Sequence, residues 1–108
     1  MIGLGKWTGT VNVQILKVTG DVTITISDNN GAYDVQIELP EKLSKVKLIF
    51  DSIEEQGEDT LVGKGNLITP LGRSLKFSAQ VKFDGDTVTG FLKISLATIN
   101  IKNGHRID

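Results

Sequence analysis

Apolar and polar side chains alternate most clearly in residues 22–27 and 33–39, on either side of Asn30 and Gly31. In both runs every second side chain is Val, Ile, Tyr or Leu, and those between are polar. Successive side chains of a strand point to opposite faces, so the alternation predicts two strands with one apolar face. An Asn-Gly pair favours a two-residue turn because both residues accept positive φ. This segment therefore predicts an antiparallel hairpin with one face in water.

The same period recurs along the chain, with turn residues between the runs. Pro40 ends the run 33–39, and residues 41–44 are long enough for one helical turn at most. The first strand places Ile15 inward and Leu16 outward, which requires a bulge or bend, and Gly20–Asp21 then turns the chain. The further predicted strands are residues 7–18, 45–53, 60–69, 74–83, 88–96 and 99–101. About eight antiparallel strands in a meander are expected, with no α-helix.

Eight sequential strands with one apolar face must bury that face against something. The sheet either closes into a barrel or splits into two packed sheets, and the pattern favours a closed or nearly closed barrel over the sandwich. No linker or change of composition divides the chain, so residues 1–108 are predicted to form one all-β domain. A chain of 108 residues can bury a core without disulfides, and this one contains no cysteine.

Trp7 is the only tryptophan and follows Gly5 and Lys6 directly before the first predicted strand. This Gly-x-Trp sequence resembles the signature of lipocalins and, more broadly, of calycin barrels. Residues 61–65, 77–81 and 83–90 resemble the body of small bacterial lipocalin-like domains, which occur alone or appended to hydrolases. The resemblance implies that Trp7 closes one end of the barrel and that a basic residue, here Arg106, packs across its indole ring. The chain lacks the T-D-x motif of lipocalins.

A calycin-like barrel implies a small apolar ligand, and eight strands enclose either packed side chains or one small molecule. The inward positions include several aromatic residues, so a mostly packed interior with a residual cavity is expected. Three inward positions carry no side chain and so leave space, namely Gly63, Gly65 and Gly90. These glycines either mark bends of the sheet or border that cavity. Tyr33 is the one polar group expected inside, so the predicted ligand carries about one hydrogen-bonding group.

Some apolar residues fall on the polar face of otherwise alternating strands, namely Ile49, Val62, Ile68 and Phe91. If they are neighbours, they form an apolar patch. Such a patch would serve a homodimer or a larger protein partner, and an accessory domain acting through Ile49, Val62 and Phe91 is the alternative to ligand binding. In a two-sheet packing the same residues would be internal.

The net charge of the chain bears on which partners it is expected to bind. Twelve Lys and Arg against thirteen Asp and Glu give a net charge of −1, so there is no overall field to attract nucleic acid or anionic lipid. Neither nucleic acid nor a membrane is predicted as a partner. No signal-peptide pattern is visible, and a cytoplasmic location is the default expectation.

Catalytic and metal-binding patterns are equally weak. His105 is the only histidine and lies near the end of the chain, and the acidic residues between 51 and 59 lack ordered ligand spacing. No catalytic residue, metal or cofactor is therefore predicted. Hydrolase or isomerase chemistry around Tyr33 is a third and weaker alternative.

Overall fold

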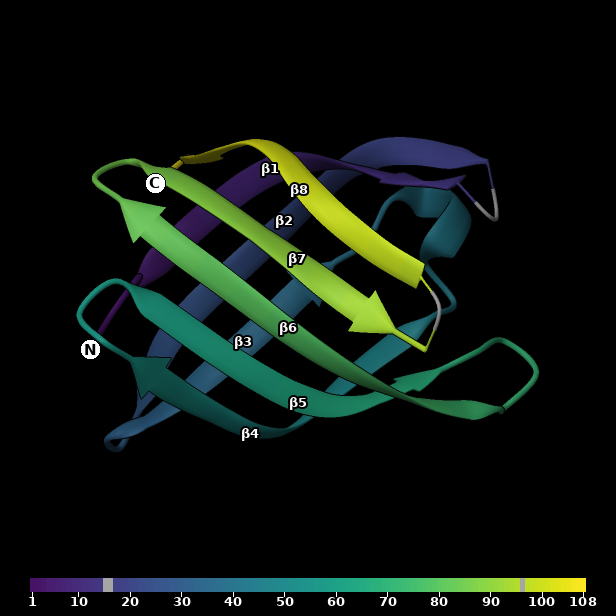
Figure 1. The fold of residues 1–108 in the computed structure, drawn as a ribbon, viewed down its shortest axis with the longest axis horizontal. Helices are drawn as coiled ribbons and strands as arrows, with labels where there is room; N and C mark the ends of the chain where they lie inside the picture. The colour runs from purple at the N-terminus through teal and green to yellow at the C-terminus, as the bar shows by residue number, and fades with distance from the viewer. Residues whose placement is uncertain (15–16, 96) are drawn as a thin grey trace.

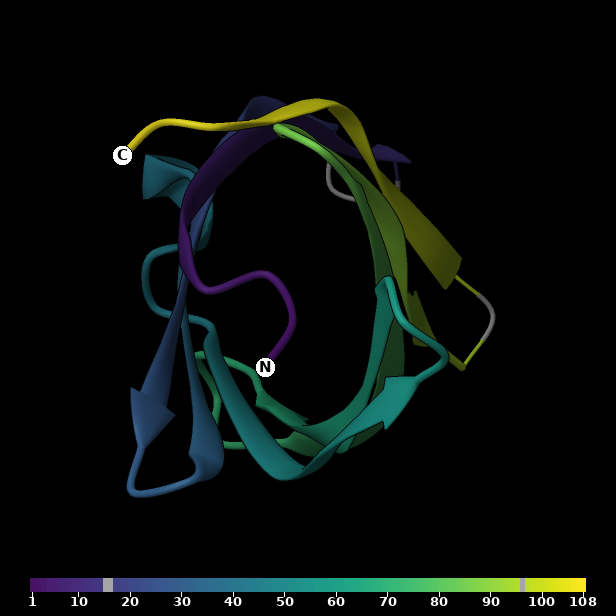
Figure 2. The same ribbon diagram turned by 90° about the vertical axis from the view of Figure 1, so that its left-hand side faces the viewer.

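The computed structural model describes residues 1–14, 17–95 and 97–108. Ile15, Leu16 and Leu96, to which the sequence pattern gives places on strands, lie outside the described residues. The chain forms one antiparallel sheet of eight strands that curls into a nearly closed barrel, which confirms the predicted fold class (Figures 1 and 2). The elements are β1 (Gly5–Val13), β2 (Val18–Asn29), β3 (Ala32–Glu38), the 3₁₀-helix η2 (Glu41–Leu43), β4 (Lys47–Gln56), β5 (Thr60–Ile68), β6 (Ser74–Asp84), β7 (Thr87–Ile94) and β8 (Ala97–Arg106).

The barrel is joined through the first and last strands. The order across the sheet is β3-β2-β1-β8-β7-β6-β5-β4, and β1 pairs with both β2 and β8. The two edges of the sheet are consequently β3 and β4, which follow one another along the chain through η2. No ladder of the described residues joins β3 to β4, so a seam runs between them.

The prediction for the first strand is wrong. β1 ends at Val13 and β2 begins at Val18, so the chain reverses before Gly20 rather than at it. Gly20 pairs with Val11 inside the β1–β2 ladder. A Cβ atom at position 20 would lie 2.8 Å from Cβ of Pro40. The glycine thus permits a close contact with the segment after β3, where the sequence suggested a turn.

A β-bulge changes the faces of β4. The register with β5 shifts between Phe50, which pairs with Gly65, and Ser52, which pairs with Lys64. The extra residue reverses the alternation, so that Phe50 and Ile53 both face the interior. The strand also runs three residues past its predicted end, to Gln56, and β8 is longer than predicted because it continues to Arg106.

The tightest packing closes one end of the barrel around Trp7, which is 1% exposed. Its ring lies 4.8 Å from that of Phe83, and Arg106 Cζ lies 4.3 Å from the Trp7 ring. The chain before β1 curls across this end (Figure 2). Trp7 Nε1 donates a hydrogen bond to the Gly3 carbonyl (2.9 Å), and Arg106 Nη1 donates one to the Leu4 carbonyl (2.8 Å). We call this the closed end.

Replacing Trp7 by Ala should lower the free energy of unfolding by about 3–5 kcal/mol, because it leaves a cavity and removes the surface on which Arg106 stacks. The matched control is Phe91→Ala on the outer face of β7, with an expected loss of about 1 kcal/mol. Urea denaturation followed by circular dichroism measures both. Equal losses for the two variants would contradict the role given to Trp7.

Candidate ligand-binding cavity

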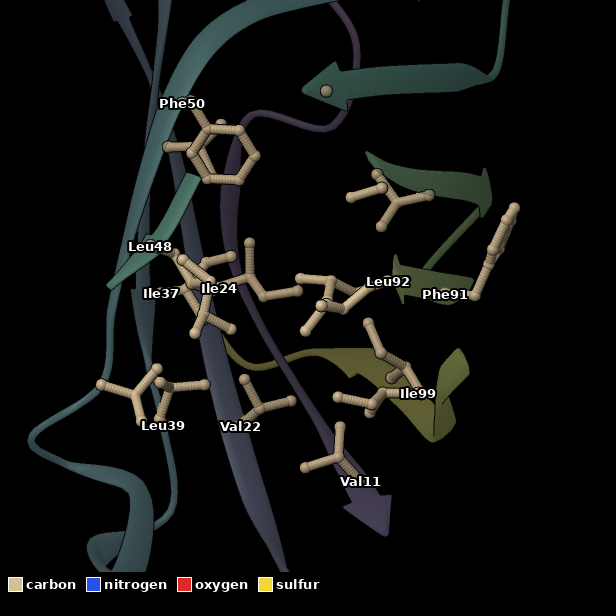
Figure 3. Close-up of a pocket in the computed structure, with 18 of the residues that line it drawn as sticks. Val11, Val22, Ile24, Ile37, Leu39, Leu48, Phe50, Phe91, Leu92 and Ile99 are labelled. Atoms are coloured by element: carbon tan, nitrogen blue, oxygen red, sulfur yellow. The ribbon is translucent and has the colours of Figure 1, made fainter. Parts of the chain in front are cut away.

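The interior beyond Trp7 contains a cavity of about 500 Å³. All eight strands contribute to its wall, and Leu43 of η2 adds to it. Its size falls within the roughly 300–1,000 Å³ of small-molecule sites. The lining includes Val11, Val22, Ile24, Ile37, Leu39, Leu48, Phe50, Leu92 and Ile99 (Figure 3).

The cavity exists because the large side chains are unevenly distributed along the barrel. Trp7 and Phe83 fill the closed end, and Phe77 is buried in edge-to-face contact with Phe50, their centroids 5.3 Å apart. Elsewhere the opposing walls carry Val, Ile, Leu and Ala, whose side chains are shorter than aromatic ones. The sequence predicted a mostly packed interior from the number of inward aromatics. The structure instead combines a packed end with a hollow one.

Polar groups are nearly absent from the lining. Among the described lining residues, only Thr69 and Gln80 have polar side chains. Gln80 is exposed and lies between the inward residues Ala79 and Val81, so its side chain points outward. Thr69 begins the connection between β5 and β6. A ligand inside the barrel therefore finds a hydrogen-bonding side chain only near that connection.

Four connections surround the end opposite Trp7, which we call the open end. They join β1 to β2, β3 to β4 through η2, β5 to β6, and β7 to β8, and all lie on the same side of the barrel (Figure 1). Leu43 and Val46 of the β3–β4 connection and Pro70 of the β5–β6 connection border the cavity. Because residues 1–7 block the closed end, the open end is the route by which a ligand would reach the cavity.

The three glycines of the predicted site have separate roles. Gly63 lines the cavity, and a Cβ there would lie 2.9 Å from Cε1 of Phe50. Gly65 and Gly90 are not among the lining residues. Gly65 lies beside the bulge of β4, and Gly90 lies at the register shift between β7 and β8. Of the two explanations that the sequence left open, Gly63 fits the cavity and the other two fit the bends.

Tyr33 lies at the seam rather than in the cavity. Its hydroxyl accepts a hydrogen bond from the Ile2 backbone N–H (2.6 Å) and donates one to Oε2 of Glu55 on β4. The side chain thus ties the N-terminal segment, β3 and β4 together where the strands themselves do not pair. Burial and the hydrogen bond to the Glu55 carboxylate raise the pKa of Tyr33 above its usual value of 10.0. The residue expected to bind the ligand is occupied by these contacts.

The structure does not bring the outer apolar residues into one patch. Val62 and Phe91 lie in one row across β5, β6 and β7, but Gln80 separates them. Ile49 is 51% exposed and pairs with Asn66, whereas Val62 pairs with Glu54. Figure 3 shows Phe91 pointing away from the cavity, on the side opposite Leu92.

Other kinds of site find little support in the described part of the chain. No three His, Asp or Glu side chains there are placed to hold a metal ion. Within residues 1–14, 17–95 and 97–108, no helix has the length and apolar character needed to cross a membrane.

Tyr33 is the only tyrosine, so its ionisation can be followed directly by the absorbance of tyrosinate. We expect a midpoint above pH 10, and a lower midpoint in Glu55→Gln, which removes the carboxylate. Because protonated Tyr33 is favoured in the folded state, its contribution to the free energy of unfolding is fully present below pH 10. This contribution is lost as the pH rises through the raised pKa. Glu54→Gln is the control and should leave the midpoint unchanged. Equal shifts in the two variants would argue against the Tyr33–Glu55 contact.

No protein-family model, curated protein or solved structure was found to match this chain. The cavity geometry therefore carries the functional argument.

Proposed function

We propose that the protein is a non-catalytic, lipocalin-like barrel that holds one small apolar molecule in its interior. The carrying observation is the cavity of about 500 Å³, walled by apolar side chains from every strand and blocked at one end by Trp7. The Gly5-Lys6-Trp7 sequence and the position of Arg106 over Trp7 support the lipocalin-like assignment.

The free energy for binding would come from removing apolar surface from water. A dry cavity forfeits dispersion contacts along its wall, and a ligand of matching shape restores them. Each methylene group transferred contributes about 0.8 kcal/mol, so six would contribute roughly 5 kcal/mol before the costs of association. The described lining residues carry no charged group, so none of them forms an ion pair that opposes or directs this binding.

The position of Thr69 determines where in the cavity a polar group of the ligand finds a hydrogen-bond partner. A hydroxyl at the open end can reach water or Thr69, whereas one deep in the cavity meets only apolar side chains. The ligand class that fits is an apolar molecule with at most one polar end, held with that end outward. This differs from the expectation that Tyr33 supplies an internal partner.

Two alcohols of equal length test this polarity. An environment-sensitive apolar dye such as N-phenyl-1-naphthylamine should bind with enhanced fluorescence, and decanol should displace it. Decanediol must bury a second hydroxyl without a partner, so it should bind at least about tenfold more weakly. Equal displacement by the two alcohols would contradict binding in the cavity.

Filling the cavity tests its location. Ala79 lines the wall on β6, and Ala79→Phe should weaken dye binding about fivefold or more by occupying the space. Ala32→Phe makes the same change at an exposed position outside this cavity and should leave the affinity unchanged. Circular dichroism confirms that each variant is folded. Unaltered affinity in a folded Ala79→Phe protein would place the dye elsewhere.

A further inference from the structure

The connections of an antiparallel meander alternate between the two ends of the barrel. Those that follow β1, β3, β5 and β7 lie at the open end, and those that follow β2, β4 and β6 lie at the closed end (Figure 1). Charged residues in these connections are therefore sorted into two groups by the fold, whatever their order along the chain.

The sorting separates the charges by sign. The charged residues of the open-end connections are Lys17, Lys42, Lys45 and Arg73, with Glu41 as the one carboxylate. All five are exposed, and none takes part in an ion pair with the described residues. The closed-end connections carry Glu58, Asp59 and Asp86 and no lysine or arginine. A net charge near zero thus conceals basic connections at the open end and acidic connections at the closed end.

The β5–β6 connection also presents an apolar side chain beside this basic group. Leu71 is 98% exposed. The turn is held by hydrogen bonds from the Gly72 N–H to the Thr69 carbonyl (2.9 Å) and from the Thr69 N–H to the Arg73 carbonyl (2.8 Å). Pro70 fixes its own φ within this turn. The hairpin projects beyond the rest of the open end, so Leu71 is held out in water (Figure 1).

We propose that the open end docks on an anionic lipid bilayer, with Leu71 inserted among the headgroups and the four basic residues facing the anionic lipids. Basic residues close to such a surface attract it, and a single apolar side chain adds to binding when it enters the interface.

A net charge near zero does not oppose this docking, because only charges close to the bilayer interact with it. At physiological salt, screening confines the interaction to about 8 Å, whereas the barrel is 35 Å in its longest extent. An open end in contact with the bilayer therefore leaves the acidic end several screening lengths away. Docking requires no ligand in the cavity. If the cavity does carry an apolar molecule, docking places its entrance against a reservoir of such molecules.

Vesicle sedimentation of the full chain tests the surface. Vesicles of phosphatidylcholine containing about a third phosphatidylserine should bind the protein, with binding weakened by added salt, and vesicles of phosphatidylcholine alone should bind little. Absence of binding to the anionic vesicles at low salt would overturn the proposal.

Two charge-matched triple variants locate the contact. Lys42→Gln/Lys45→Gln/Arg73→Gln should reduce partitioning roughly 100-fold, at about fivefold per residue. The control, Lys6→Gln/Lys64→Gln/Lys82→Gln, removes the same charge from the outer wall of β1, β5 and β6 at positions further from the open end and should change partitioning less than about threefold. An equal or greater loss in the wall variant would overturn docking through the open end.

Two single variants separate insertion from charge and docking from ligand binding. Leu71→Ser should weaken vesicle binding about tenfold at constant charge, because it removes the apolar side chain that enters the interface. The fold should be unaffected, since Leu71 is exposed and packs against none of the described residues. No change in this variant would overturn insertion. Ala79→Phe, which fills the cavity, should bind vesicles as the wild type does. Loss of vesicle binding in a folded Ala79→Phe protein would instead assign the lipid contact to the cavity.

Discussion

The pairing of β1 with β8 is the constraint on which the rest of this barrel depends. It turns a meander with one apolar face into an enclosure, because it brings the first and last strands side by side. In the same ladder Trp7 lies opposite Arg106, so the register that closes the sheet also places the cation over the indole. The closed end and its N-terminal cover follow from this single register. The seam follows too, because closure at β1 and β8 leaves β3 and β4 as the edges.

Local sequence was sufficient to predict features that depend on a single hairpin or a single strand. Asn30 and Gly31 have φ of 54° and 91°, as their pairing in the sequence predicts, and the flanking runs form β2 and β3. It was insufficient where segments distant in sequence meet. Gly20 is required by Pro40, and the bulge of β4 is accompanied by the close approach of Gly65 to the β4 backbone. A glycine by itself does not show whether it serves a turn or a neighbour.

The candidate site shows the same division. Alternation predicted which side chains face inward, but not at which level along the barrel axis each side chain lies. Tyr33 is on an inward position, yet its height places it beside Glu55 at the seam. Trp7 and Phe83 fill the closed end, whereas most of the cavity wall carries Val, Ile and Leu. The charge separation, by contrast, was partly available from sequence, since counting strands assigns each connection to an end, although Lys17 and Lys45 fell inside predicted strands. The overall charge balance concealed this signal.

The two free edges at the seam carry a further consequence. An unpaired edge strand is a template for strands of other molecules, and such growth leads to aggregation. Here β3 contains Asp34 and Glu38 and no lysine or arginine, and β4 contains Asp51, Glu54 and Glu55 after Phe50. Two copies that met through β3 would bring its carboxylates together, and the bulge of β4 would interrupt a ladder formed on that edge. Like charge on β3 and an irregular backbone on β4 are two features that oppose such growth at an open edge.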